Sequence, residues 1–227
     1  MAPTTDRLLP APPAGPGGGT GPQAAGDSFL DLALRQRAHH RFDPQAPVPD
    51  ADVMAMLTVA THAPSALNTQ PWQFVVVRSA EVRRAFGAAT RERWRAGTGA
   101  AREKNLVPGS VFSELDDGNG NGGLETAPVV IIVCFDTTKI EPAHGASSIY
   151  PAMQNLLLAA AALGYGSCLT TGLVDGSGAL VRELLELPDR LELMAAVFVG
   201  RPARTLGAPR RHPAETCTYR EVFGSPW

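Results

Sequence analysis

The stretch Ala63–Trp72 reads A-P-S-A-L-N-T-Q-P-W and combines four polar side chains with two prolines. Each proline fixes its own φ and biases the preceding residue away from helix, which predicts a stiff loop. In such a loop Ser65, Asn68 and Gln70 would present donors and acceptors at nearly fixed places. That arrangement suits a ligand with a hydrogen-bonding edge, although the same residue types are also ordinary turn formers after a helix.

A second group with chemical potential is the cationic run R-Q-R-A-H-H-R-F, from Arg35 to Phe42. Arginine guanidinium groups match phosphate oxygens through pairs of parallel hydrogen bonds, so the run could form an anion site. Its members would be Arg35, Arg37, His40 and Arg41. The alternative is a solvated helix end, because cations are favoured at the C-terminus of a helix.

Signatures of other catalytic machinery are missing from the sequence. It has no G-x-S-x-G nucleophile elbow, no H-E-x-x-H zinc motif and no G-x-x-x-x-G-K-[ST] phosphate loop. The five histidines do not share metal-ligand spacing with cysteines or acids, so no metal site is expected. An enzyme built on this chain would therefore need a cofactor to carry its chemistry.

Composition and charge narrow the class of protein. The chain has 227 residues, 44% of them hydrophobic, and a net charge of −2, which fits one globular domain and gives no electrostatic reason to bind nucleic acid or a membrane surface. Its three scattered cysteines fit a reducing, cytoplasmic setting. Residues 1–26, rich in Ala, Pro and Gly, are predicted to form a disordered tail, and residues 27–227 a single domain.

The elements that would position the polar groups alternate between helix and strand. Helices are predicted at 28–38, 51–62, 79–95, 147–163 and 175–187, the first two capped by Ser28 and Asp50. Strands are predicted at 74–77, 128–135, 167–171 and 191–200. This order indicates an α+β fold in the form of an α/β-type three-layer sandwich.

Three segments carry further expectations. Residues 102–123 end in D-D-G-N-G-N-G-G, and this glycine content predicts a mobile, lid-like loop. The helix at 147–163 is apolar nearly all round, which implies burial inside something large, such as the core of a dimer. Residues 201–227 form a C-terminal extension.

Four segments together resemble the nitroreductase family of FMN-dependent NAD(P)H oxidoreductases. The most specific is A-P-S-A-L-N-T-Q-P-W-Q-F-V-V-V; the others are the arginine-rich helix end before R-F-D-P, the stretch A-L-G-Y-G-S-C-L-T-T-G, and E-L-L-E-L-P followed by a strand and G-R-P-A. They occur in the family's order over roughly residues 30–211. The resemblance implies a central mixed sheet flanked by helices, and a domain-entwined homodimer with FMN sites at the subunit interface.

The roles implied by the resemblance divide between two subunits. Arg37, with Arg35 or Arg41 close by, would hold the FMN phosphate and ribityl chain. The C-terminal side of the phosphate would be closed by Arg210 and Arg211. From the other subunit, the flavin ring would be met by Pro64, Ser65, Ala66 and Asn68. The N5 edge of the flavin would lie beside Thr170, Thr171 and Gly172.

The chain departs from the family pattern at Gln36, Ala38 and His40, where arginine, serine and arginine or lysine are common. The missing serine hydroxyl removes one hydrogen bond to the phosphate or ribityl chain, worth about 1 kcal/mol. His40 would add positive charge only below its usual pKa, which is about 6.5.

The resemblance implies that FMN, rather than a catalytic side chain, carries the reaction. NAD(P)H would pass a hydride to flavin N5 and leave, and a nitroaromatic, quinone or similar electron-poor acceptor would then be reduced in a ping-pong cycle. The L-T-T-G stretch also resembles the iodotyrosine deiodinase and flavin-destroying branches, but residues 91–123 lack the tyrosine of a deiodinase lid. The alternatives are a flavin-dependent dehydrogenase or oxidase of a biosynthetic intermediate, a flavin-binding protein without turnover, and an interaction module acting through residues 1–26.

Overall fold

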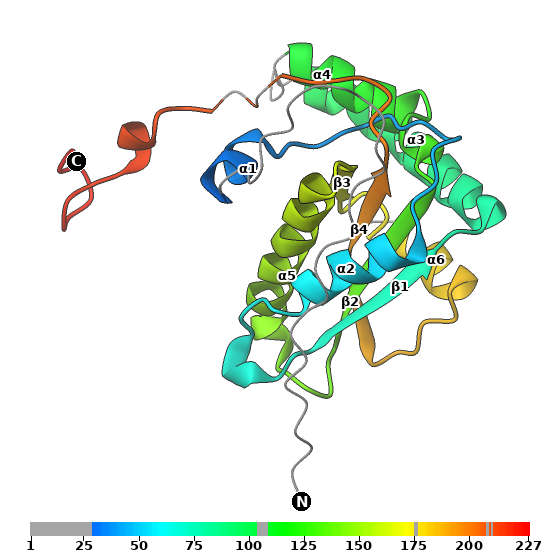
Figure 1. Cartoon of the computed structure of the whole chain (residues 1–227), viewed down its shortest axis with the longest axis horizontal. Helices are drawn as coiled ribbons and strands as arrows, with labels where there is room; N and C mark the ends of the chain where they lie inside the picture. Colours follow the sequence, from blue (N-terminus) through cyan, green and yellow to red (C-terminus); the bar gives the residue numbers. More distant parts are fainter. Residues whose placement is uncertain (1–28, 104–108, 175–176, 208, 210) are drawn as a thin grey trace, which may run out of the picture.

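The structure is a computed structural model that describes residues 29–103, 109–174, 177–207, 209 and 211–227 (Figure 1). The predicted tail at 1–26, the predicted cap Ser28 and the predicted phosphate ligand Arg210 lie outside the described residues. Those three expectations therefore stay predictions.

A four-stranded sheet forms the centre of the fold, with the strand order β1-β2-β4-β3 (Figure 1). Its strands are β1 Trp72–Val77, β2 Val129–Asp136, β3 Gly166–Thr170 and β4 Leu191–Gly200. Each of the three strand pairings is antiparallel. The parallel pairing expected of a mixed sheet occurs in the described residues as one bridge, between Ala38 and Ser167 of β3.

Helices cover both faces of the sheet, which confirms the three-layer arrangement (Figure 1). One face is covered by α2 Asp50–Ala60 and α5 Pro142–Ala162, and the other by α3 Ala80–Glu103 and α6 Gly178–Leu184. Two shorter helices lie outside these layers: α1 Phe29–Arg35 contacts α5, and α4 Gly109–Leu115 follows α3.

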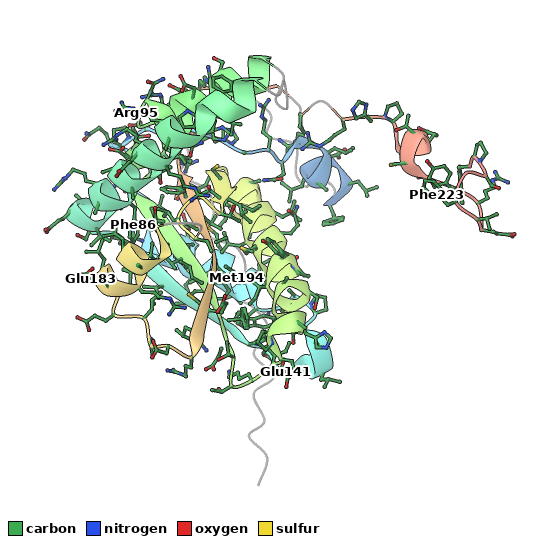
Figure 2. The ribbon with its side chains drawn as sticks, turned by 180° about the vertical axis from the view of Figure 1, so that it is seen from behind. Phe86, Arg95, Glu141, Glu183, Met194 and Phe223 are labelled. Atoms are coloured by element: carbon green, nitrogen blue, oxygen red, sulfur yellow. The ribbon has the colours of Figure 1, made fainter. Side chains whose placement is uncertain are left out.

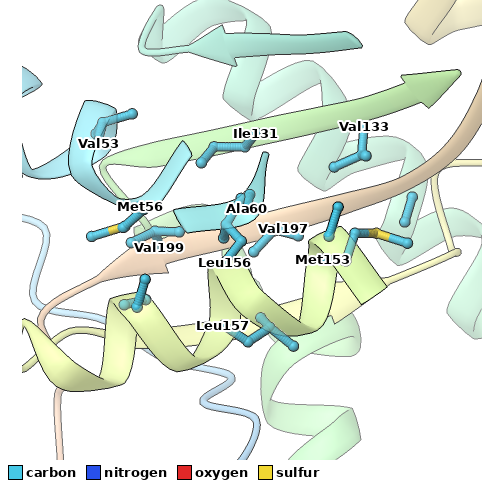
Figure 3. Close-up of a cluster of buried hydrophobic side chains, with 14 of the residues drawn as sticks. Val53, Met56, Ala60, Ile131, Val133, Met153, Leu156, Leu157, Val197 and Val199 are labelled. Carbon is cyan, nitrogen blue, oxygen red and sulfur yellow. The ribbon is translucent and has the colours of Figure 1, made fainter. Parts of the chain in front are cut away.

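β2 is buried along its whole length because it lies inside the sheet, between two helical layers. Its side chains alternate between two cores: Ile131 and Val133 pack on the α2 and α5 side, whereas Val130 and Ile132 pack on the α3 and α6 side. Figure 3 shows the first core, where side chains of α2, α5, β2 and β4 gather. The continuous apolar run of this strand fits its burial on both faces.

Several helix ends differ from the prediction. Asp50 does not cap α2; it is the first helical residue, and Pro49 occupies the cap position without a side-chain hydrogen bond. α5 begins at Pro142, where the missing N–H of proline costs nothing because the first helical N–H groups have no partner in the helix. α1 ends at Arg35 because the chain then runs beside β3, where His39 N donates to Ser167 O at 2.9 Å.

The segment at 102–123, predicted as a mobile, lid-like loop, has regular structure in its described residues, 102–103 and 109–123, whereas its mobility stays a prediction; residues 102–103 end α3. In residues 109–123, α4 is followed by a π-helical turn, η2 Asp116–Gly120, before the short helix η3 Leu124–Thr126. A Cβ on Gly118 would lie 2.7 Å from Cβ of His40, and one on Gly120 would lie 2.6 Å from Oδ1 of Asp116. These glycines allow close packing. The glycine content of a sequence does not distinguish this role from flexibility of the backbone.

The chain leaves β4 beside residues 41–43 and then turns away from the body of the molecule (Figures 1 and 2). Residues 211–227 contain the short helix η4 Ala214–Cys217 and a turn closed by a bridge between Tyr219 and Pro226. Phe223, in this turn, is 90% exposed. Within the described residues, no helix has the length and apolar character that crossing a membrane requires.

Candidate cofactor site

A cavity of about 670 Å³ lies where the segment after α1 meets the chain leaving β4. Backbone hydrogen bonds hold the two segments side by side: Asp43 N donates to Arg201 O at 2.9 Å, and Ala203 N donates to Arg41 O at 3.1 Å. We call this the basic cavity, because its lining includes Arg35, Arg37, His39, Arg201 and Arg204. The structure thus brings the predicted residues Arg35 and Arg37 together with two arginines that sequence reasoning missed.

The end of α5 forms one wall of the basic cavity. Gly164, with a φ of 78°, ends the helix in the left-handed conformation that glycine adopts without strain. The next residue, Tyr165, donates its hydroxyl to Asp52 Oδ2 at 2.5 Å, and the guanidinium of Arg201 lies 4.6 Å from its ring centre. Burial and the Asp52 carboxylate raise the pKa of Tyr165 to about 12, so this phenol stays neutral.

Both arginines expected at the centre of the phosphate site are paired with carboxylates from the α4–η2 segment. Arg37 Nη2 lies 2.8 Å from Glu114 Oε2, and its Nη1 donates to Gly207 O at 2.9 Å. Arg41 donates through Nη2 and Nε to the carboxylate of Asp117, the shortest contact being 2.6 Å. The hydrogen bonds from Arg41 hold the pKa of Asp117 below its usual range.

Three buried nitrogen atoms in this segment have no hydrogen-bond partner among the described residues: Arg37 Nε, His39 Nδ1 and His40 Nδ1. Burial lowers the pKa of both histidines, so their neutral forms are favoured near pH 7. A buried polar group without a partner costs about 1–3 kcal/mol. Arg37 Nε is a donor, and each histidine Nδ1 is a donor or an acceptor according to its tautomer, so a ligand with acceptor oxygens would find at least one unsatisfied donor here.

The loop at Ala63–Trp72 is organised by its own hydrogen bonds. Gln70 N donates to Ser65 Oγ at 3.0 Å, and Thr69 Oγ1 donates to the carbonyl of Ala66 at 2.9 Å. Ala66 N donates to Ser148 Oγ at 3.1 Å, which fastens the loop to α5. These contacts agree with the predicted stiffness.

Backbone strain is concentrated in the same loop. Leu67, Asn68 and Gln70 have φ values of 52°, 55° and 48°, a region that residues other than glycine seldom adopt. Leu67 is 97% exposed, whereas Trp72 at the end of the loop is 8% exposed and belongs to the first core. Strained backbone of this kind clusters at functional sites.

The remaining predicted residues lie at the far end of β3 and in the C-terminal segment. Thr170 is the last residue of β3, and its Oγ1 accepts a hydrogen bond from Gly172 N at 3.0 Å. Thr171 is exposed, as is Arg211 in the C-terminal segment. None of these residues lines the basic cavity.

The two halves of the predicted site lie at opposite ends of α5 (Figure 1). The loop is attached at Ser148, near the start of the helix, whereas Ala161, near its end, lines the basic cavity. Thirteen residues of helix span about 20 Å. Within one chain the loop and the basic cavity are therefore separate.

Comparison with known proteins identifies the family. The family model described as "Nitroreductase family" matches residues 33–201, and the chain belongs to this family. A protein of Thermus thermophilus named NADH dehydrogenase is 30% identical over 81% of this chain and 91% of its own length. An iodotyrosine deiodinase of Thermotoga neapolitana is 29% identical over 77% of this chain and 88% of its own. A crystal structure from Desulfovibrio desulfuricans, in complex with FMN, aligns with a TM-score of 0.67 and 26% identity over 88% of this chain and 99% of its own.

Proposed function

We propose that this protein is an FMN-dependent oxidoreductase that takes its electrons from NAD(P)H. The observation that carries the proposal is the basic cavity, which combines four arginines with unpartnered nitrogen atoms of Arg37 and His39. Guanidinium groups and free N–H donors are the groups that bind a phosphate dianion most strongly. The FMN complex of the Desulfovibrio desulfuricans protein, which shares the fold, supports FMN as the phosphate ester.

The residues present fit FMN despite the departures from the family pattern. Ala38 offers no hydroxyl, and His40 is mostly neutral near pH 7 because burial lowers its pKa. Arg201 and Arg204 supply cations from the chain that leaves β4. The cavity thus keeps a positive charge sufficient for a phosphate, even with Glu114 paired to Arg37.

The site requires two copies of the chain. Because the loop and the basic cavity lie about 20 Å apart on α5, one chain cannot close both around a single flavin. A two-fold axis crossing α5 would bring the loop of each subunit to the cavity of the other. Exposed apolar side chains support such a homodimer: Leu67 is 97% exposed, and Phe29 and Leu34 of α1 are 68% and 71% exposed.

Within this dimer the loop and β3 would orient the ring system. FMN, when bound, supplies the capacity to accept and donate a hydride. Asn68 is exposed on a strained, hydrogen-bonded loop, so its amide would meet the ring edge of the partner's cofactor with little loss of freedom. Pro64, Ser65 and Ala66 would exclude water from the same edge, and Thr170 and Thr171 would lie beside N5.

The names of relatives support a choice of electron donor and acceptor. The name of the Thermus thermophilus relative supports NADH as donor. We propose nitroaromatics and quinones as acceptors, reduced in a ping-pong cycle. Reductive deiodination is a second candidate, favoured by the Thermotoga neapolitana relative and by the L-T-T-G stretch at the end of β3.

An absorption spectrum of the purified protein tests the cofactor, and anaerobic titration with NADH and with NADPH tests the donor. We expect a flavin spectrum, bleaching by one or both nucleotides, and recovery on addition of a quinone, a nitroarene or 3-iodotyrosine. The acceptor that restores the spectrum fastest distinguishes the two candidates. Colourless protein that neither binds added FMN nor oxidises NAD(P)H would contradict the proposal.

A further inference from the structure

The phosphate site has fewer available cations than its arginine content suggests. Arg41 donates hydrogen bonds from Nε and Nη2 to the carboxylate of Asp117. Arg37 donates from Nη2 to Glu114 and from Nη1 to the carbonyl of Gly207. Arg201 donates to Gly164 O at 3.1 Å while its guanidinium lies over the ring of Tyr165. Three of the arginines around this segment are therefore already bound to other parts of the chain.

Arg204 differs from these three arginines. Within the described residues it has no hydrogen bond or ion pair, and its side chain is exposed. It lines the basic cavity and also a second cavity of about 430 Å³, whose other lining residues include Arg41, Asp117 and Asn121. Arg204 therefore stands between the two cavities that border the cationic run.

The backbone fixes Arg204 beside that run. Pro202 forms an antiparallel bridge with Phe42, and Ala203 N donates to Arg41 O, so residue 204 follows directly on a paired segment. Its charge reaches the run: after burial and the field of nearby charged groups, Arg204 contributes to the lowered pKa of His40. The positive charge of Arg204 therefore lies near His40. This is the position at which the family commonly has arginine or lysine.

We propose that Arg204 binds the phosphate of FMN and supplies the cation that the cationic run lacks at position 40. The inference rests on the proposed function, since it assigns a residue to the same cofactor. A free guanidinium can turn both of its donor edges to the phosphate oxygens without breaking an existing ion pair. The ligand group recognised is a phosphate monoester dianion, so the isoalloxazine ring takes no part in this contact.

The test compares FMN with riboflavin, which lacks the phosphate. Apoprotein carrying Arg204→Gln is titrated with each flavin, with quenching of flavin fluorescence as the readout. We expect the Kd for FMN to rise about tenfold, the effect of losing a charge-assisted hydrogen bond, and the Kd for riboflavin to stay unchanged. Arg204→Lys should restore part of the FMN affinity. Arg84→Gln removes the same charge from an exposed position on α3 and should change neither constant.

Three results would overturn the inference. The first is an FMN affinity at the wild-type value in Arg204→Gln. The second is an equal loss of FMN and riboflavin affinity in that variant, as a general structural effect would give. The third is an equally large loss of FMN affinity in Arg84→Gln. Thermal unfolding of each apoprotein variant confirms that the fold is intact. If the wild-type protein binds neither flavin, the proposed function fails, which is distinguishable from failure of the Arg204 assignment alone.

Discussion

At the residue scale, the pairing of Arg37 with Glu114 places a carboxylate where a phosphate would bind. The contact is 2.8 Å long and both side chains are partly buried. Glu114→Gln should release the guanidinium and remove a negative charge, so we expect FMN to bind about three- to tenfold more tightly, a change of about 1 kcal/mol. Fluorescence titration of apoprotein measures the change.

Glu183→Gln is the matched control for this substitution. Glu183 is an exposed glutamate of α6, which covers the face of the sheet opposite α2 and α5 (Figure 2). Its replacement by glutamine changes the net charge by the same amount. Unchanged or weaker FMN binding in Glu114→Gln would show that Glu114 positions Arg37 for the phosphate instead of competing with it.

The two histidines beside Arg37 make stability depend on pH. Burial lowers the pKa of His39 and of His40 below 6.5, so the unfolded chain takes up protons that the folded chain does not. Their contribution is present above about pH 6.5 and is lost as the pH falls from there towards their folded pKa values. We expect the free energy of unfolding, measured with urea in phosphate-free buffer, to fall between about pH 7 and pH 5.

Replacement of His39 and His40 by asparagine should make that decline shallower. The exposed residue His212 is the control, and His212→Asn should leave the slope as in the wild type. An identical slope in all three proteins would mean that other groups set the dependence. Asp117, whose pKa Arg41 lowers, loses its own contribution only at more acidic pH, so the two effects are separable.

Sequence reasoning identified only part of the cationic site. Arg35 and Arg37 were found because the run from Arg35 to Phe42 is conspicuous in the chain. Glu114 lies 77 residues from Arg37, and no local pattern links them. Arg204 was missed although a signal existed: the segment G-R-P-A-R follows the last strand, and its pairing with residues 41–43 brings it to the cavity.

At the element scale, one hydrogen bond joins the start of α2 to the turn after α5. Tyr165 is buried and donates its hydroxyl to Asp52 Oδ2 at 2.5 Å. Tyr165→Phe keeps the ring over which Arg201 lies and removes the hydrogen bond from the hydroxyl to Asp52. We expect the free energy of unfolding to fall by about 1–2 kcal/mol, measured by urea unfolding at fixed protein concentration.

Tyr219→Phe serves as the comparison, because Tyr219 lies in the C-terminal turn, 37% exposed, away from both cores. A loss of stability in Tyr165→Phe no larger than in Tyr219→Phe would indicate that the short contact adds nothing beyond solvation. Burial and this hydrogen bond together raise the pKa of Tyr165 to about 12, since only a neutral hydroxyl can donate to Asp52.

The sequence predicted strands better than helix ends and turns. β4 was predicted at its observed bounds, and β2 within one residue, because the predicted β2 is an unbroken apolar run and β4 is apolar apart from Glu192, which is the pattern of a buried strand. The helical structure at 109–123 was not predicted, because it depends on contacts with residues distant in the sequence. Gly118 packs on His40 and Gly120 beside Trp94, and neither neighbour is visible in the local sequence.

At the scale of the whole molecule, a substitution of Leu67 tests whether the loop lies in the interface of the proposed homodimer. Leu67 is 97% exposed and has a φ of 52°, a conformation that costs a residue with a Cβ about 1–2 kcal/mol. Leu67→Asp should leave the monomer folded, with an unchanged circular dichroism spectrum. We expect the mass from sedimentation to shift from dimer to monomer, and bound FMN to fall with it.

Met54, an exposed apolar residue of α2, provides the control substitution Met54→Asp. If this variant dissociates and Leu67→Asp does not, the interface includes α2 instead of the loop. Wild-type protein that sediments as a monomer with FMN bound would contradict the two-subunit site altogether.

The length of α5 has a consequence for mixtures of variants. One chain can carry a defective cavity, through Arg37→Ala, and another a defective loop, through Asn68→Ala. In a mixed dimer one site combines both defects, while the other joins the intact cavity of one chain to the intact loop of the other. Random exchange makes half of the dimers mixed, so about a quarter of the wild-type sites should return. Two inactive proteins would then recover flavin binding by subunit complementation.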